Sequence, residues 1–404
     1  MFLDAEKTMA YFGKKTVKPS SLFPLFFGVV SMLALACGQA SKPVSYGTWE
    51  DLPLRFAKGF SVKKSGDNYW VEVLEAFPKA DRSYHYLVIQ GDSTLPDLPA
   101  QIDFDAIVRL PAETVAVTST THIPHLDMLG VTRLLGGFPG RELISSELQR
   151  GRIEANEVRE LGTGASLNVE SVMDLSPDWL MVSTVGNSLQ QISVLSNAGI
   201  PIILNGDYVE GHPLGVAEWI KLTGILTGTS DQADQLFEEI TRSYIEAQQL
   251  VKDKMDIHRP RVMSGVMYND SWYASGSDSW ASVLIEHAGG DYLFKENRGK
   301  GGLTLSYEYI LDRAESADFW IGAADYPSRQ ALAKQDAKYI AFRPFQTGNI
   351  FTYTGQKGAT GGLLYFELGY IRPDLVLKDL IKIMHPDLLP DYELFFYERI
   401  DERL

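Results

Sequence analysis

The stretch "LNVESVMDLSPDWL", Leu167–Leu180, contains a helix start, a short helix and the beginning of an apolar strand. A related stretch in the second half of the chain, Leu305–Trp320, reads "LSYEYILDRAESADFW" and repeats this order. In each stretch a residue that commonly caps helices follows the first Leu, and a glutamate comes two positions after the cap. Glu170 and Glu308 therefore take matching places just inside a helix start, where the helix dipole favours an acid. One copy in each half indicates two related lobes.

The sequence around these stretches alternates between short apolar runs and helical segments. The apolar runs suit buried parallel strands, and the alternation indicates βαβ units. In the first half they are "TVAVTS" (114–119), "DWLMVS" (178–183) and "IPIILN" (200–205). The same rhythm returns after Pro260 with "RVMSGVM", "DFWIGA" and "NIFTYT". Between Leu54 and Gln90 the apolar residues instead alternate with polar ones, which predicts a few antiparallel strands attached to the first lobe.

One segment separates the two halves. Thr229–Met255 has no Gly or Pro, and its apolar residues recur at three and four positions, which predicts a single amphipathic helix. The expected fold is α/β, with two Rossmann-like lobes joined by one long backbone helix. Each lobe is a mostly parallel sheet with flanking helices. The predicted parts are a first lobe over 54–228, a connecting helix over 229–257 and a second lobe over 258–404.

The N-terminus reads as a targeting segment. Lysines precede the apolar run Leu22–Ala36, which is typical of a secretory signal and short for a membrane span. Cys37, the only cysteine, follows directly and resembles the lipid-bearing cysteine of bacterial lipoproteins. In the lipoprotein motif that precedes such a cysteine, the positions of Ala34 and Leu35 usually hold Leu and then a small residue, so a plain signal peptide is the alternative. We expect a signal peptide over 1–36, a lipid on Cys37, a tether over 37–53, and a place on the periplasmic side of the cell envelope.

Charge and motifs exclude several kinds of function. The net charge of −15 argues against nucleic acid as a partner. The sequence has no G-x-S-x-G, phosphate loop, G-x-G-x-x-G or H-E-x-x-H. We therefore expect no enzyme activity and name no catalytic residue.

The segment "LIEHAGGDYLF", the repeated stretch after it and the tail "YIRPDLVLKDLIKIMHPDLLP" make the chain resemble a protein family over Ile107–Leu389. This family consists of the class III substrate-binding proteins of ABC importers, which bind iron-siderophores, cobalamin or haem. The resemblance implies a monomer that delivers a metal chelate to a permease dimer. The ligand is cargo, most readily an iron-siderophore, then cobalamin, then haem; no resident cofactor or metal is expected. It also implies that Glu170 and Glu308 dock on permease arginines, although both could be simple helix-start acids.

Candidate ligand contacts in the first lobe follow its strands. "STTHIPH" comes after the first core strand and offers Thr121 and His122, with His125 on the same helical face. The two histidines could form half of a zinc or haem site, or simply begin a helix. Asn187 follows the next strand and could lie on the same rim.

The second lobe offers aromatic and basic candidates. Tyr268, Trp272 and Trp280 lie in "MYNDSWYASGSDSWASVLIEHAGG", where they could stack on a macrocycle or on catecholate rings. The alternative is that at least two of the aromatic residues of this stretch pack the core. Three further candidates are a base that could neutralise an anionic ligand and two residues after the last strand: Arg343, Tyr353 and Lys357.

Two other functions stay open. A free zinc or manganese carrier needs three or four converging ligands, and only His122 and His125 suit that role. A chelatase-like tetrapyrrole enzyme has a similar bilobal plan and would need a catalytic His with an acid across the cleft. A lipid anchor argues against the enzyme, since metal insertion is normally cytosolic.

Overall fold

The computed structural model describes residues 49–91, 102–163, 166–184, 186, 189–254, 256–268 and 271–400, all within one unit that spans 46–404. Cys37 and Asn187 lie outside the described residues, and of Tyr268 only the backbone is described. Within the described ranges, no helix has both the length and the apolar character needed to cross a membrane.

The N-terminal strands form one sheet in the order β1-β2-β3-β4-β5. The first four pair antiparallel, as predicted, but β5 pairs parallel with β4. Their inner side chains, such as Val71 and Tyr86, belong to the same core cluster as Trp179 of the first lobe. The sheet is therefore part of the first lobe's core. The bounds are β1 (Glu50–Leu52), β2 (Phe60–Ser65), β3 (Asn68–Val73), β4 (Tyr84–Gln90) and β5 (Ala106–Leu110).

The first lobe is built on a parallel sheet in the order β12-β11-β6-β7-β8. Its strands are β6 (Val115–Val117), β7 (Leu135–Phe138), β8 (Arg159–Glu160), β11 (Trp179–Val182) and β12 (Ile202–Leu204), with a small ribbon of β9 (Gly162–Thr163) and β10 (Ser166–Leu167) beside it. The helices are α1 (Ile123–Met128), α2 (Glu147–Glu154), α3 (Val169–Leu175), α4 (Leu189–Asn197), α5 (Pro213–Glu218) and α6 (Ile220–Thr227), with 3₁₀ turns η1 (Thr120–His122), η2 (Thr132–Leu134), η3 (Arg141–Leu143) and η4 (Asp207–Val209).

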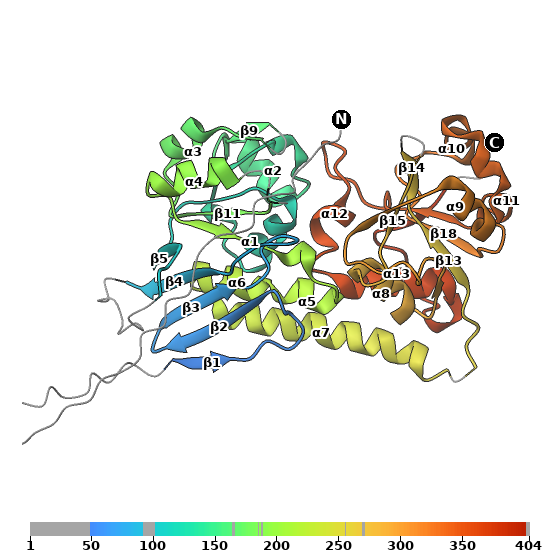
Figure 1. The fold of residues 1–404 in the computed structure, drawn as a ribbon, viewed down its shortest axis with the longest axis horizontal. Helices are drawn as coiled ribbons and strands as arrows, with labels where there is room; N and C mark the ends of the chain where they lie inside the picture. The colour runs from blue at the N-terminus through green and yellow to red at the C-terminus, as the bar shows by residue number, and fades with distance from the viewer. Residues whose placement is uncertain are drawn as a thin grey trace, which may run out of the picture. The chain divides into compact units, whose positions relative to one another are not determined.

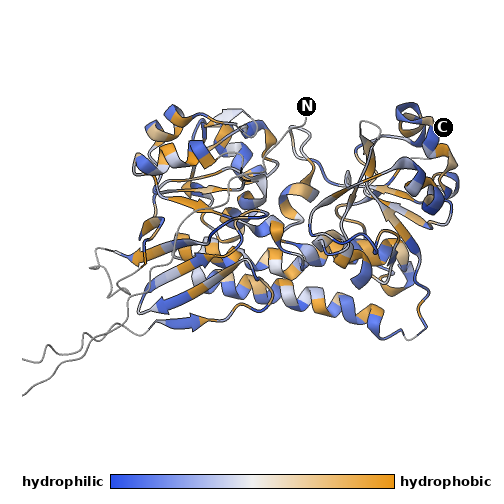
Figure 2. Ribbon diagram, viewed as in Figure 1, coloured by the Kyte–Doolittle hydropathy of each residue, from blue (hydrophilic) through white to orange (hydrophobic). Residues whose placement is uncertain are grey.

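A single helix, α7 (Ser230–Lys252), joins the lobes, close to the predicted bounds (Figure 1). Apolar and polar bands alternate along it (Figure 2). The apolar face, including Phe237 and Tyr244, is buried in the core of the second lobe. The helix packs against α6 of the first lobe and against α13 of the second, so it belongs to both lobes.

The second lobe repeats the plan, with strands in the order β16-β13-β18-β19-β20, parallel except for β20. The strands are β13 (Arg261–Ser264), β16 (Asp291–Tyr292), β18 (Phe319–Ile321), β19 (Ile350–Thr352) and β20 (Glu398–Arg399). A separate antiparallel sheet holds β14 (Val266–Tyr268), β15 (Ser271–Ser275) and β17 (Gly302–Leu305). The helices are α8 (Trp280–His287), α9 (Tyr307–Ala314), α10 (Arg329–Gln335), α11 (Arg343–Thr347), α12 (Leu364–Leu368) and α13 (Pro373–Met384), with η5 (Ala337–Ala341) and η6 (Pro386–Leu388). The predicted α/β fold of two parallel-sheet lobes is confirmed.

Candidate functional site

The carboxyl ends of the parallel strands carry the loops at which the lobes meet. In open α/β sheets this edge is where ligands bind. In the first lobe, β6 leads into η1 and β12 leads into η4; in the second, β19 leads into the segment 353–363 and then α12. The second-lobe helix α12 packs against η1 and α1 of the first lobe. Residues from both lobes therefore meet directly at this edge.

His122 and Asp207 form a buried polar pair on the first-lobe side. His122 is 1% exposed, and its Nε2 lies 3.8 Å from Oδ2 of Asp207. Burial, with a contribution from His125, lowers the pKa of His122 to about 3. Burial also raises the pKa of Asp207 to about 7, against hydrogen bonds from Tyr208 and Thr121. The distance alone would allow an ion pair, but burial disfavours both charges, so we treat His122 as neutral.

The two ring nitrogens of His122 make no hydrogen bond to any residue within the described ranges. A buried polar atom without a partner costs free energy, so this imidazole is a candidate to contact a ligand. His125 is buried to the same degree but has a partner, because its Nδ1 lies 3.0 Å from Oγ1 of Thr223. The two rings stay close, with centroids 6.3 Å apart, but their partners differ: His122 faces Asp207, and His125 contacts Thr223. Within the described ranges, no group of three or more His, Cys, Asp or Glu could hold a metal ion.

Trp280 and Tyr370 lie on the second-lobe side of this region. Trp280 begins α8 directly after its N-cap, Ser279, and its ring centroid is 4.9 Å from that of Tyr370. Burial raises the pKa of the Tyr370 phenol to about 12, and the charge of Asp207 adds to the effect. That electrostatic influence crosses from one lobe to the other. The packing agrees, since α8, which Trp280 begins, packs against α5, and α5 packs against η4, which contains Asp207.

Tyr353 continues this aromatic surface after β19. Its ring centroid lies 4.3 Å from that of Tyr365 and 5.2 Å from that of Phe366, both on α12. A Cβ at Gly322, just after β18, would lie 2.0 Å from the Tyr353 hydroxyl oxygen, so only glycine fits there. Tyr353 thus spans the carboxyl ends of two strands and supports α12.

A carboxylate on α12 holds the lobes together. Glu367 accepts hydrogen bonds from the backbone N–H of Ser145 at 2.7 Å and of Ser146 at 2.8 Å, both in the first lobe. Glu367 is 2% exposed, and burial raises its pKa to about 7 despite these two bonds. Gly358 and Gly362 approach the same loop, since a Cβ on either would lie 2.6 Å from an atom of the Ser145 side chain.

A pocket of about 680 Å³ lies beside this contact and is lined by both lobes. Arg150 from α2 and Lys357 from the second lobe bring positive charge to it, while Glu147 and Glu154 bring negative charge. The Nζ atom of Lys357 lies 2.9 Å from Asp325, and the side chain stays 40% exposed. The remaining lining residues are Ser145, Ser146, Gly151, Gln356, Gly358, Ala359 and Leu364.

Two predicted ligand contacts lie elsewhere. Trp272 is fully buried on β15, where it donates a hydrogen bond to the Ser264 carbonyl and packs against the ring of Trp320. It belongs to the hydrophobic core, as the alternative for this aromatic stretch allowed. Arg343 forms a 2.8 Å ion pair with Asp318, which immediately precedes β18. That is the amino end of the strand, so the structure does not bring Arg343 to the carboxyl ends of the strands, where the candidate site lies.

Sequence reasoning missed three residues that the structure brings to this region: Asp207, Glu367 and Tyr370. Asp207 had a usable signal, because it follows the apolar run of β12 as His122 follows that of β6. Glu367 and Tyr370 lie within and just after an apolar helix, and no local pattern marks either one.

The repeated acids are exposed in the first turns of α3 and α9, one in each lobe (Figure 1). The Asn168 side chain accepts from the Ser171 N–H at 2.8 Å, and the Ser306 hydroxyl accepts from the Tyr309 N–H at 3.3 Å. These caps are the local reason why Glu170 and Glu308 take equivalent positions.

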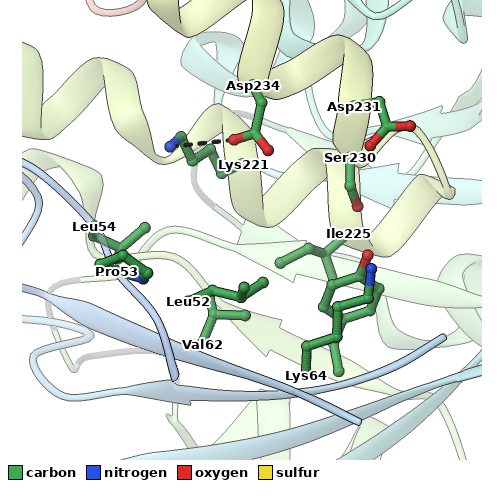
Figure 3. A pocket seen from close by; sticks show the side chains of 11 residues that line it. Leu52, Pro53, Leu54, Val62, Lys64, Lys221, Ile225, Ser230, Asp231 and Asp234 are labelled. Atoms are coloured by element: carbon green, nitrogen blue, oxygen red, sulfur yellow. Dashed lines mark ion pairs between the residues drawn. The ribbon is translucent and has the colours of Figure 1, made fainter. Parts of the chain in front are cut away.

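A smaller pocket of about 290 Å³ lies between the N-terminal sheet and α6–α7 (Figure 3). Leu52, Val62 and Ile225 line it together with charged residues. Lys221 pairs there with Asp234 at 3.1 Å. This pocket is formed away from the strand ends where the lobes meet, so it is separate from the candidate site.

Two lobes on one rigid helix, with a polar site between their strand ends, define a substrate-binding protein. A family model described as "Periplasmic binding protein" matches residues 115–353, and the chain belongs to that family, the class III substrate-binding proteins. A curated relative, an uncharacterized lipoprotein of Methanocaldococcus jannaschii, is 22% identical over 72% of this chain and 69% of its own length.

Solved structures share the fold. A periplasmic haem-binding protein of Pseudomonas aeruginosa aligns with a TM-score of 0.56 and 16% identity, over 72% of this chain and 99% of its own. A possible iron-binding periplasmic protein of Staphylococcus epidermidis aligns with a TM-score of 0.52 and 18% identity, over 68% of this chain and 99% of its own. The family match begins at residue 115 and so leaves out the N-terminal sheet.

Proposed function

We propose that this chain is an extracytoplasmic, lipid-anchored binding protein that captures an iron chelate between its lobes and delivers it to the permease of an ABC importer. The observation that carries the proposal is the pocket of about 680 Å³ lined by both lobes at their strand ends. Pockets of about 300–1,000 Å³ are typical for small organic ligands. The family and its solved neighbours are binding proteins, which supports a role without catalysis.

A ferric siderophore is the first candidate ligand. Many such chelates are anionic, and Arg150 and Lys357 face the pocket from opposite lobes. Each of these bases could contact an anionic group of the ligand, and Glu147 and Glu154 balance their charge in the pocket lining. Trp280 and Tyr353 do not line this pocket, but catecholate rings of a ligand that extends beyond it could pack against them.

Haem is the second candidate, and His122 favours it. A neutral imidazole is the form that ligates iron, and both nitrogens of His122 lack a partner within the described ranges. Cobalamin, the remaining alternative, would use the same cleft.

The test is a binding screen on the full chain carrying Cys37→Ser, with haemin, catecholate and hydroxamate ferric siderophores, and cobalamin. A ligand at 100 times its dissociation constant adds about 2.7 kcal/mol to the free energy of unfolding, which a thermal shift detects. Lys357→Gln and Arg150→Gln should weaken siderophore binding, and His122→Gln should weaken haemin binding. Lys334→Gln, on exposed α10, is the matched control. Absence of binding to every probe would refute the proposal.

The anchor is tested separately. Cys37 lies outside the described residues, and its lipidation rests on the signal-like sequence before it. Cys37→Ser should release the protein into soluble fractions. Equal membrane fractionation of the variant and the parent would remove the anchor from the proposal.

Glu170 and Glu308 complete the proposal as docking residues for a permease dimer. Both are exposed, and each lies at a helix start in a different lobe. Two separated acids can fix the orientation of a partner as well as its affinity.

A further inference from the structure

The loop that follows β3, Leu74–Phe77, packs against the carboxyl ends of the parallel strands of the first lobe, where the candidate site lies. A Cβ on Gly206, just after β12, would lie 2.2 Å from the carbonyl oxygen of Glu75. A Cβ on Gly186, after β11, would lie 3.3 Å from the Phe77 ring. The loop therefore covers the carboxyl ends of β11 and β12, although it comes from the N-terminal sheet outside the family match.

Hydrogen bonds fix this loop to the first lobe. The N–H groups of Leu74 and Glu75 donate to the carbonyl oxygen of Gly59, at 2.7 and 3.3 Å. The Gly59 N–H in turn donates to Oε1 of Glu210 at 2.8 Å, and Trp219 Nε1 donates to the same oxygen at 3.1 Å. Glu210 is 5% exposed, so the support is buried. A loop ordered in advance loses little conformational entropy when it meets a partner surface.

The loop also reaches the second lobe. Oε2 of Glu75 lies 3.1 Å from Nζ of Lys300, and both side chains are about half exposed. Next to this ion pair the lobes approach closely through their backbones: a Cβ on Gly211 would lie 2.7 Å from the carbonyl oxygen of Asp278. The same Cβ would touch the stem of Lys300 at 4.0 Å.

We infer that Leu74–Phe77 is a clasp, added to the ligand cleft by the N-terminal sheet, that holds the second lobe through Glu75 and Lys300. The clasp limits how far the lobes open on this side of the cleft, and so it restricts the entry of bulky chelates. Its role in ligand entry rests on the proposed function, but its effect on lobe separation does not.

The experiment measures lobe separation without ligand. In the full chain with Cys37→Ser, Gln190→Cys on α4 and Lys334→Cys on α10 carry a fluorescent donor and acceptor, and single-molecule energy transfer gives the open and closed populations. Glu75→Lys should raise the ratio of open to closed molecules roughly threefold to tenfold, since an exposed ion pair is replaced by like charges. The double variant Glu75→Lys/Lys300→Glu restores the pair and should return the ratio to within about twofold of the parent.

Lys295→Glu is the matched control, because Lys295 pairs with Asp291 inside the second lobe. It should leave the ratio unchanged. Gly211→Ala is a second, uncharged variant that should open the cleft by steric contact with Asp278. The inference is overturned if Glu75→Lys keeps the parent ratio while Gly211→Ala, which shows that the assay detects opening, raises it, if both variants keep the parent ratio, or if the swapped pair fails to reverse the effect of the single charge reversal.

A second readout is the association rate of haemin, which should rise at least twofold when the clasp is broken in Glu75→Lys. An unchanged haemin rate in a variant that opens the lobes would overturn the restriction on entry. If no screened chelate binds even the parent, the proposed function fails, while the energy-transfer result still decides the clasp.

Discussion

Replacing Glu367 by Gln tests whether the contact between α12 and the first lobe contains a buried carboxyl group whose pKa is raised. The side chain is 2% exposed and receives two backbone N–H groups, from Ser145 and Ser146. Gln keeps the size of the side chain but cannot ionise, and it offers one acceptor oxygen instead of two. The substitution therefore removes the titration of this group and also removes one hydrogen bond between the lobes, because the amide NH2 cannot accept from a backbone N–H.

The pH dependence follows from the raised pKa. Burial lifts the pKa of Glu367 from 4.5 to about 7, so the folded protein holds this proton more tightly than the unfolded chain. Stability from this group is highest below pH 4.5 and is lost as the pH rises towards 7. One pKa unit corresponds to about 1.4 kcal/mol, so the loss reaches about 3 kcal/mol.

Other buried groups titrate in the same range. Asp207 acts in the same direction as Glu367, because its pKa is also raised to about 7. His122 acts in the opposite direction: its pKa is lowered to about 3, so its contribution is lost as the pH falls below 6.5. These groups are present in both proteins, so the difference between variant and parent isolates Glu367.

Urea unfolding of both proteins at pH 5 and pH 8, followed by tryptophan fluorescence, is the assay. Relative to the parent, Glu367→Gln should gain about 2–3 kcal/mol between the lower and the higher pH. Glu246→Gln, at an exposed position on α7, is the control and should follow the parent. If the free energy of unfolding changes with pH in the same way for Glu367→Gln and the parent, Glu367 does not have a raised pKa.

Three further predictions concern packing, motion and docking. Trp272→Ala should cost about 3–5 kcal/mol of stability because it empties a core position, whereas Trp280→Ala should mainly weaken ligand binding; the reverse result would exchange their roles. Because α7 is one uninterrupted helix, ligand should reduce the radius of gyration only slightly, and a large decrease in X-ray scattering would contradict a stiff connection. Glu170→Arg/Glu308→Arg should bind ligand normally yet fail to support uptake by the cognate importer, and uptake at the parent rate would exclude docking through these acids.

The sequence predicted the features that depend on local chemistry. The bounds of α7 follow from an unbroken amphipathic pattern, and the matching starts of α3 and α9 follow from their capping residues. The parallel pairing of β5 with β4 could not be predicted in this way, because register between strands depends on the whole sheet.

The site was harder to predict because it depends on which end of a strand a residue occupies. His122 was found by its place after β6, and Asp207 has the same relation to β12. Arg343 was misplaced because its partner, Asp318, lies before β18 rather than after it. Trp272 could not be recognised as core from its sequence, because Trp272, Tyr273 and Ala274 are consecutive and the alternation of buried and accessible side chains along β15 appears only in the structure.

The contacts between the lobes escaped prediction for a different reason: their essential atoms belong to the backbone. Glu367 binds the N–H groups of Ser145 and Ser146, which any non-proline residues would supply. Beside it, Gly358 is required only because a Cβ would meet the Ser145 side chain at 2.6 Å. It follows that Ser145→Ala should preserve the hydrogen bond to Glu367, while Gly358→Ala should push the lobes apart on this side. Closure of the cleft is thus determined by how closely the backbones of the two lobes approach, a property that appears only once both lobes are folded.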